Sequence, residues 1–210
     1  MAPRTETSPA GARPRQDRRR QRHEATRREI LDAAWAMVRS GGLAALSLTA
    51  LARSVGMEPQ SLYTYFASKH AIYDAMFADG NRELLARLSA VPTSGGPREL
   101  LRQQARIFVE FSSEDPARSQ LLFQRPIPDF EPSAESYASA VEVLTRARDG
   151  QAAAGLAGDA QFDLWTALVA GLAAQQMAND PGGDRYARLI DDAVDMYVGH
   201  VLGPPPASSP

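Results

Sequence analysis

Apolar side chains recur along this chain at the three- and four-residue spacing of an α-helix. Between residues 23 and 40 they fall at i, i+3, i+4, i+7 and i+8, which predicts one helix with a single buried face. Gly41 and Gly42 follow, and glycine readily takes the left-handed conformation that ends a helix. No segment alternates β-branched with polar residues, so the predicted fold class is all-α. The apolar positions of the first helix are Ile30, Ala33, Ala34, Met37 and Val38.

Proline positions divide the rest of the chain. Thirteen of the fifteen prolines cluster at residues 3–14, 92–97, 116–132 and 204–210, and the other two are Pro59 and Pro181. An interior proline breaks a helix. The proline-poor stretches therefore predict further helices, with an extended loop at 125–132 and a turn at 180–183. The predicted helices cover residues 68–90, 96–112, 115–124, 133–155, 157–179 and 184–201.

Two short helices are predicted between residues 47 and 66. Ser47 can cap the first, and Pro59 suits the first turn of the second. Two helices joined by a tight glycine turn form the helix-turn-helix pattern. That geometry needs a small residue at the crossing, a residue tolerant of positive φ in the turn and an aliphatic anchor. Ala52, Gly56 and Leu62 meet these three needs.

The net charge of −2 conceals an uneven distribution of charge. Residues 1–70 hold twelve basic and six acidic side chains, whereas residues 71–210 carry a net charge of −8. A basic N-terminal part suggests a polyanionic partner. Residues 1–22 lack core-forming side chains and are predicted to be a disordered basic arm, suited to a DNA minor groove or else a solvated tail without a fixed role. Its arginines include Arg13, Arg15, Arg18, Arg19, Arg20 and Arg22.

Several classes of protein are disfavoured. The chain has no cysteine, which excludes disulfides and thiolate sites. Its N-terminus lacks the apolar core of a signal peptide, and its longest uncharged run is too short and polar to span a membrane, so a cytoplasmic protein is expected. No metal site, cofactor motif or nucleophile–base pair is found, which argues against an enzyme. The three histidines, His23, His70 and His200, lie far apart in sequence.

The run from Leu48 to Lys69 resembles the signature of TetR-type transcriptional regulators. Its most specific part is Leu62-Tyr63-x-Tyr65-Phe66-x-x-Lys69, and the resemblance covers about residues 24–84. It implies a homodimeric repressor that leaves a pseudo-palindromic double-stranded DNA operator when a small-molecule effector binds. The expected domains are a helix-turn-helix domain at 23–70, continued by a connecting helix to about residue 84, an effector and dimerisation domain at 71–202, and a disordered tail at 203–210.

The resemblance also implies roles for residues in the motif. Ser47 and Thr49 would approach phosphates, and Lys69 would bind a phosphate at the start of the next helix. Gln60 and Ser61 would face base edges, and glutamine can pair bidentately with adenine. Tyr63 and Tyr65 would contact the DNA backbone or thymine methyl groups. The alternative is that the tyrosines are core aromatics and that the lysine is merely solvated.

Large apolar residues in the second half are candidates to line an effector pocket. Trp165 and Phe123 are the first choices, with Glu110 and Asp163 as acidic neighbours that would suit a cationic or hydrogen-bonding ligand. Ordinary core packing is the alternative for each aromatic side chain. The candidates are Met76, Phe77, Phe108, Phe111, Phe123, Tyr137, Phe162 and Trp165.

The last two predicted helices offer a dimerisation surface. Ala167, Ala170, Gly171 and Ala174 are small enough for close helix approach, so two helices from each subunit could form a symmetric contact. Internal packing is the alternative. The apolar stripe of the final helix comprises Tyr186, Leu189, Ile190, Ala193, Val194, Tyr197 and Val201.

The rival functions are an activator or effector-independent regulator, a helical small-molecule enzyme, or a binding module without DNA function.

Overall fold

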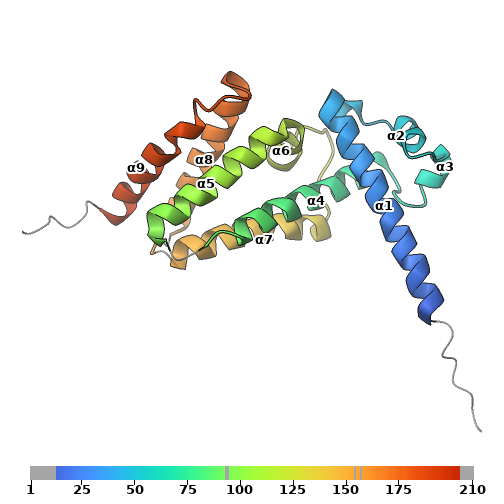
Figure 1. Ribbon diagram of the computed structural model, residues 1–210, viewed down its shortest axis with the longest axis horizontal. Helices are drawn as coiled ribbons and strands as arrows, with labels where there is room; N and C mark the ends of the chain where they lie inside the picture. The colour runs from blue at the N-terminus through green and yellow to red at the C-terminus, as the bar shows by residue number, and fades with distance from the viewer. Residues whose placement is uncertain (1–12, 93–94, 154, 157, 204–210) are drawn as a thin grey trace, which may run out of the picture. The chain divides into compact units, whose positions relative to one another are not determined.

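The computed structural model describes residues 13–92, 95–153, 155–156 and 158–203, and all regular structure within these ranges is helical (Figure 1). The chain divides into two compact units, the first ending at Ile72 and the second beginning at Tyr73. The first unit holds four helical segments and the start of a fifth. These are α1 (Arg13–Gly41), the short 3-10 helix η1 (Leu43–Ala45), α2 (Leu48–Ser54), α3 (Pro59–Leu62) and the first residues of α4 (Lys69–Ser89).

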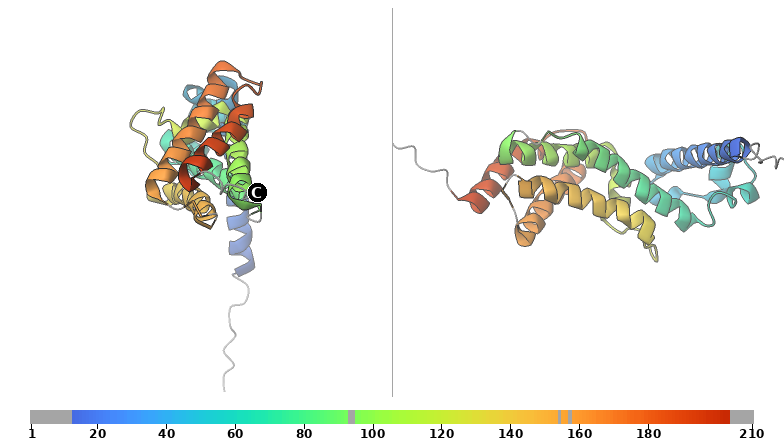
Figure 2. Two further views of the ribbon diagram at one scale, coloured as in Figure 1. Left: turned by 90° about the vertical axis from the view of Figure 1, so that its left-hand side faces the viewer. Right: turned by 90° about the horizontal axis from the view of Figure 1, so that it is seen from below.

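The second unit is a helical bundle built around α5. That helix packs against α6, α7, α8 and α9, and Figures 1 and 2 show it in the middle of these helices. Within the described residues, no helix is long and apolar enough to cross a membrane. After α4 the elements are α5 (Gly96–Glu114), α6 (Pro116–Phe123), α7 (Ala134–Ala153), α8 (Asp159–Asn179), the 3-10 helix η2 (Ala187–Leu189) and α9 (Ile190–Leu202).

The local signals that end and begin helices act as predicted. The Ser47 hydroxyl accepts from the backbone N–H of Ala50 at 3.5 Å, at the start of α2. Gly56 follows α2 with φ +67°, and Gly42 follows α1 with φ +76°, so both glycines adopt the left-handed conformation. The buried residues of α2 and α3 are Leu51, Ala52 and Leu62, which join the core of the first unit with Phe66 and Ile72.

The first helix starts earlier than predicted. α1 begins at Arg13, not at His23, so the expectation of disorder is wrong for residues 13–22, whereas residues 1–12 lie outside the described residues. Arginine and glutamine are good helix formers, and extending an existing helix needs no new nucleus. An exposed i,i+4 ion pair between Arg20 and Glu24 adds to this extension.

The apolar stripe of α9 packs inside the chain. Ile190, Ala193, Val194 and Tyr197 are buried against α5 and α8. The prediction that these four residues form a dimer contact is therefore wrong. The cause is long-range: α5 runs alongside α8 and α9 and covers the stripe, and sequence periodicity gives no sign of which neighbour a stripe meets.

The predicted turn after α8 is held by one buried amide. The Gln176 Oε1 atom accepts from the backbone N–H groups of Tyr186 at 2.9 Å and Ala187 at 3.2 Å, while its Nε2 donates to the carbonyl of Gly183 at 3.1 Å. The N–H of Arg185 and then the Gln176 amide hold the pKa of Asp180 below its usual value. These bonds fix the path of the chain from α8 into η2, so that α9 does not begin until Ile190.

Gln176→Leu should lower the free energy of unfolding by about 1–3 kcal/mol, because it leaves two part-buried backbone N–H groups without acceptors. Gln120→Leu, on the exposed face of α6, is the matched control and should change stability by less than about 0.5 kcal/mol. Denaturant unfolding followed by circular dichroism measures both. Equal stability of the two variants would contradict the structural role of Gln176.

Candidate functional site

The helix-turn-helix presents the predicted polar contacts to solvent. Ser47 and Thr49 are exposed at the start of α2, and Gln60 and Ser61 are exposed on α3. Figure 1 shows these two short helices beside α1. The core side chain of Leu62 anchors α3, so the exposed residues are carried on a fixed framework.

The two motif tyrosines have different surroundings. Tyr63 is 54% exposed and is available to a partner. Tyr65 is half-buried, because its ring stacks on His23 of α1 at a centroid distance of 4.8 Å. Its carbonyl accepts from Arg27, whose guanidinium also lies over the Phe66 ring at 4.2 Å. Tyr65 therefore packs the end of the motif against α1. Of the two tyrosines, Tyr63 is the more accessible to the predicted DNA contact.

Lys69 opens α4 and is half-buried. Ser68 caps this helix, since its hydroxyl accepts from the N–H of Ala71 at 3.1 Å. A helix N-terminus carries a partial positive charge, so the start of α4 favours an anion, as does the charge of a lysine. The phosphate contact of Lys69 stays a prediction.

Some exposed residues near the motif were not predicted as contacts. Thr64 is exposed directly after Tyr63, and Arg53 is exposed one helical turn after Thr49 on α2. Arg18, Arg19, Arg20 and Arg22, which the sequence assigned to a basic arm suited to a DNA minor groove or else to a solvated tail, lie exposed on the N-terminal extension of α1. Position in the sequence next to the predicted contacts was the available signal for Thr64 and Arg53.

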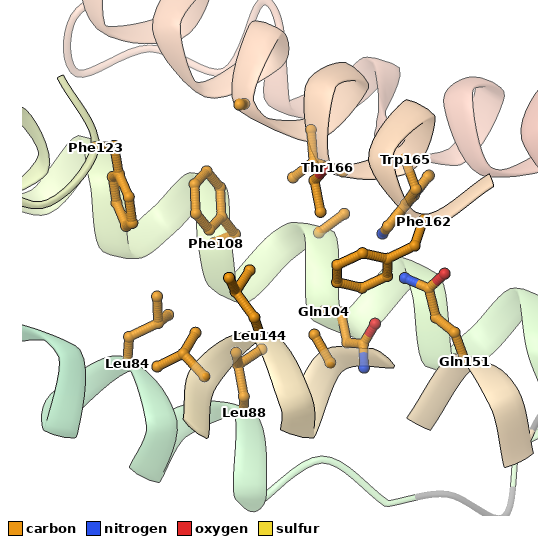
Figure 3. Close-up of a pocket in the computed structure, with 15 residues that line it drawn as sticks. Leu84, Leu88, Gln104, Phe108, Phe123, Leu144, Gln151, Phe162, Trp165 and Thr166 are labelled. Carbon is orange, nitrogen blue, oxygen red and sulfur yellow. The ribbon is translucent and has the colours of Figure 1, made fainter. Parts of the chain in front are cut away.

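An apolar cavity of about 230 Å³ lies within the second unit. Four of the predicted pocket residues line it: Phe108, Phe123, Phe162 and Trp165. The rings of Phe108 and Phe123 meet at a centroid distance of 5.1 Å, and Figure 3 shows them at one end of the cavity. The remaining lining residues are Leu84, Leu88, Gln104, Ala105, Val143, Leu144, Ala147, Gln151, Thr166, Val169 and Ala170.

The other predicted pocket residues lie elsewhere. Phe77 and Tyr137 line a neighbouring cavity of about 260 Å³, to which Phe123 also contributes. Met76 and Phe111 line neither cavity and are fully buried. The Phe111 ring lies 3.7 Å below the Arg118 guanidinium, which fixes it in the core. Periodicity could identify these two side chains as inward-facing but could not separate a pocket wall from a filled interior.

The charged and polar residues of the first cavity differ from expectation. Glu110 and Asp163 are exposed and do not line it, so the acidic neighbours predicted for a ligand are absent from its wall. Gln104 and Gln151 line it instead. They were detectable in principle, because each is a polar residue at a position where the helical spacing places apolar ones. No group of three or more His, Asp or Glu side chains in the described ranges could hold a metal ion.

The N-terminal part of the chain matches a known family in sequence. Residues 30–76 match the family model described as bacterial regulatory proteins, tetR family. This range contains α2, α3 and most of the candidate contact residues. None of the curated protein sequences compared with the chain matches it.

The fold is shared with solved structures over most of the chain. The regulatory protein SCO4313 is 24% identical, with a TM-score of 0.70 over 86% of this chain and 98% of that protein. FadR from Bacillus subtilis, solved with stearoyl-CoA, is 15% identical, with a TM-score of 0.61 over 84% of this chain and 98% of its own. A TetR variant from Acinetobacter baumannii AYE, solved with minocycline, is 16% identical, with a TM-score of 0.56 over 84% and 97% of the two chains.

We expect substitutions of Gln60 and Lys69 to affect DNA binding differently. Gln60 is exposed on α3, where it can face a base, and Lys69 lies at the start of α4, where it can face a phosphate. Lys69→Ala should weaken binding to every DNA sequence and lower the slope of log affinity against log salt by about one. Gln60→Ala should cost about 1–3 kcal/mol on the preferred sequence and relax the preference at one base pair. Selection from a randomised DNA library, followed by titration at several salt concentrations, measures both effects.

An unchanged base preference in Gln60→Ala would contradict its contact with a base. Gln120→Ala, on the second unit, serves as the control and should leave affinity, salt slope and preference as they are in the unsubstituted protein.

Proposed function

We propose that this chain, whose N-terminal helices form the DNA-binding domain of the tetR family of bacterial regulators, is a homodimeric transcriptional repressor released from its operator by a small apolar ligand. The observation that carries the proposal is the set of exposed polar residues on α2 and α3, held on a buried framework within the matched segment. DNA reading by this motif places such residues against base edges and phosphates.

The apolar cavity of the second unit supports a ligand-responsive regulator. It is lined by aromatic and aliphatic side chains with a few polar groups, which is the composition of a small-molecule site. Two proteins of the same fold were solved with stearoyl-CoA and with minocycline. For this chain we propose a ligand that is largely apolar, like the lining of its cavity.

Helix α4 can couple ligand binding to DNA binding, because it contributes residues to both candidate sites. Leu84 and Leu88 on α4 line the cavity, and Lys69 opens the same helix. A ligand that binds one position of α4 more tightly than another shifts the population toward that position. We propose that the favoured position is one in which the two DNA-binding domains of the dimer no longer match the half-sites, which lie about 34–36 Å apart.

The proposed dimer contact uses the outward face of α8 and α9. Along α8 the exposed positions Ala160, Leu164, Ala167, Gly171 and Ala174 alternate in steps of four and three residues, which is the spacing of a helix–helix seam. A Cβ placed at Gly171 meets nothing within 4 Å, so a second helix can approach closely there. On α9, Met196 is 63% exposed. This face replaces the buried stripe of α9 as the proposed interface.

The direct test uses the full chain and DNA from upstream of its own gene. A gel shift at several salt concentrations should show binding to this fragment with an affinity about 1,000-fold or more above that for a shuffled fragment. Equal affinity for the two fragments at physiological salt would refute sequence-specific regulation from that site.

The dimer contact gives a separate expectation. Leu164→Glu combined with Met196→Glu should yield a folded monomer, because two charges on the seam repel their symmetry mates and cannot be desolvated. Operator affinity should fall at least about tenfold, since two half-sites are no longer held together. Light scattering at micromolar concentration and circular dichroism measure assembly and folding.

The control is Gln120→Glu combined with Ala138→Glu, which adds the same charges at exposed positions of α6 and α7. This variant should remain dimeric and bind the operator normally. A monomeric unsubstituted protein, or a dimer that survives the seam charges, would contradict the proposed contact.

A further inference from the structure

Two buried amide side chains stand in the wall of the apolar cavity. Gln104 on α5 is 6% exposed, and Gln151 on α7 is 1% exposed. Figure 3 shows both near Phe162, at the end of the cavity away from Phe123. The cavity therefore has an aromatic and aliphatic end and an end with uncharged polar groups.

These amides lack hydrogen-bond partners among the described residues. The Oε1 atom of Gln104 and both the Oε1 and Nε2 atoms of Gln151 are buried and unbonded. Gln176, buried to a similar degree, uses both ends of its amide to hold a turn. Because an unsatisfied buried polar group is costly, a pair of such amides facing one cavity requires an explanation beyond packing.

The local backbone is arranged so that the two amides gather at one place. Gly150 precedes Gln151 on α7, and a Cβ at Gly150 would come within 3.0 Å of the Gln104 Nε2. The absence of a side chain at position 150 thus lets the Gln104 amide lie against α7. An alanine at this position would move the Gln104 amide by a few tenths of an ångström.

The wall carries no counter-charge for an ion. None of the side chains that line the cavity is charged. Two guanidinium groups lie near this end of the cavity without lining it. Arg148 lies over the Phe162 ring at 4.8 Å and is paired with Asp159 at 2.8 Å, and Arg146 lies beside Gly150, where a Cβ would meet its Nη1 at 3.5 Å. An ionised ligand group would lose its hydration here without a partner, so the site favours a neutral molecule.

We infer that Gln104 and Gln151 bind the uncharged polar group of a neutral, largely apolar ligand, and that this group is a hydroxyl or an amide that donates a hydrogen bond. The unbonded atoms are two acceptors and one donor group, so a ligand that only accepts would leave both glutamine oxygens unsatisfied. Its apolar remainder lies toward Phe108 and Phe123. This inference rests on the proposed function of the cavity as the effector site.

The test compares three probes that share a naphthalene ring and differ in the polar group, on the full-length protein. Isothermal titration should show that 2-naphthol binds at least about tenfold more tightly than 2-methoxynaphthalene, which cannot donate, and than 2-naphthoate, which is charged. Gln151→Met and Gln104→Met should each reduce the preference for the hydroxyl over the methoxy compound to about threefold or less. Gln120→Met, outside the cavity, should retain the full preference.

A stability measurement separates ligand recognition from a structural role. Without probe, Gln151→Met should be as stable as the unsubstituted protein or more stable, because it removes an unsatisfied amide and keeps its volume. A loss of stability would show that Gln151 has a structural partner and would overturn the inference. Failure of 2-naphthol to bind, or an unchanged hydroxyl preference in both variants, would overturn it as well.

The DNA-binding assay distinguishes this inference from the proposed function. If 2-naphthol binds with the expected preference but leaves operator affinity unchanged, recognition by the two glutamines stands and release by this ligand class is refuted. If the protein fails to bind the upstream fragment, the regulator proposal fails on its own, whatever the titration of the probes shows.

Discussion

The burial of α5 is the constraint on which the second unit depends. Leu101, Ala105 and Phe111 on this helix are fully buried, and α6, α7, α8 and α9 all pack against it. A helix enclosed in this way draws the apolar stripes of its neighbours inward, which leaves their small and polar residues outside. It also leaves one part of its own surface, around Gln104 and Phe108, facing a cavity that no neighbouring side chain fills. The core and the candidate ligand site therefore arise from the same packing.

The first unit depends on a different constraint, because two of its helices, α2 and α3, are too short to be stable alone. α2 packs against α1 and α3 packs against α2, and the buried side chains of the two short helices are Leu51, Ala52 and Leu62. Arg27 and His23 extend this anchoring to Tyr65 and Phe66 at the end of the motif. The result is a rigid support for exposed polar residues, which is what recognition of a nucleic acid requires.

Stability and recognition use chemically similar groups in different ways. Gln176 and Gln151 are both buried amides, yet the first bonds to backbone groups of a turn and the second faces a cavity with its amide unbonded. Tyr63 and Tyr65 are two residues apart, yet one is exposed and the other stacks on α1. Residue type alone does not distinguish these roles. The surroundings decide them, because a polar group is either satisfied within the fold or available to a partner.

The sequence by itself determined the helices and most of their ends, because Ser47, Ser68, Gly42 and Gly56 act on backbone groups only a few residues away. It also indicated the DNA-reading segment, since that motif is local and its spacing is strict. Only the tertiary structure decided that the α9 stripe is internal, that Phe111 fills the core and that Gln104 and Gln151 line one cavity. These outcomes depend on which distant helices become neighbours, and periodicity along one helix carries no information about the surface it will meet.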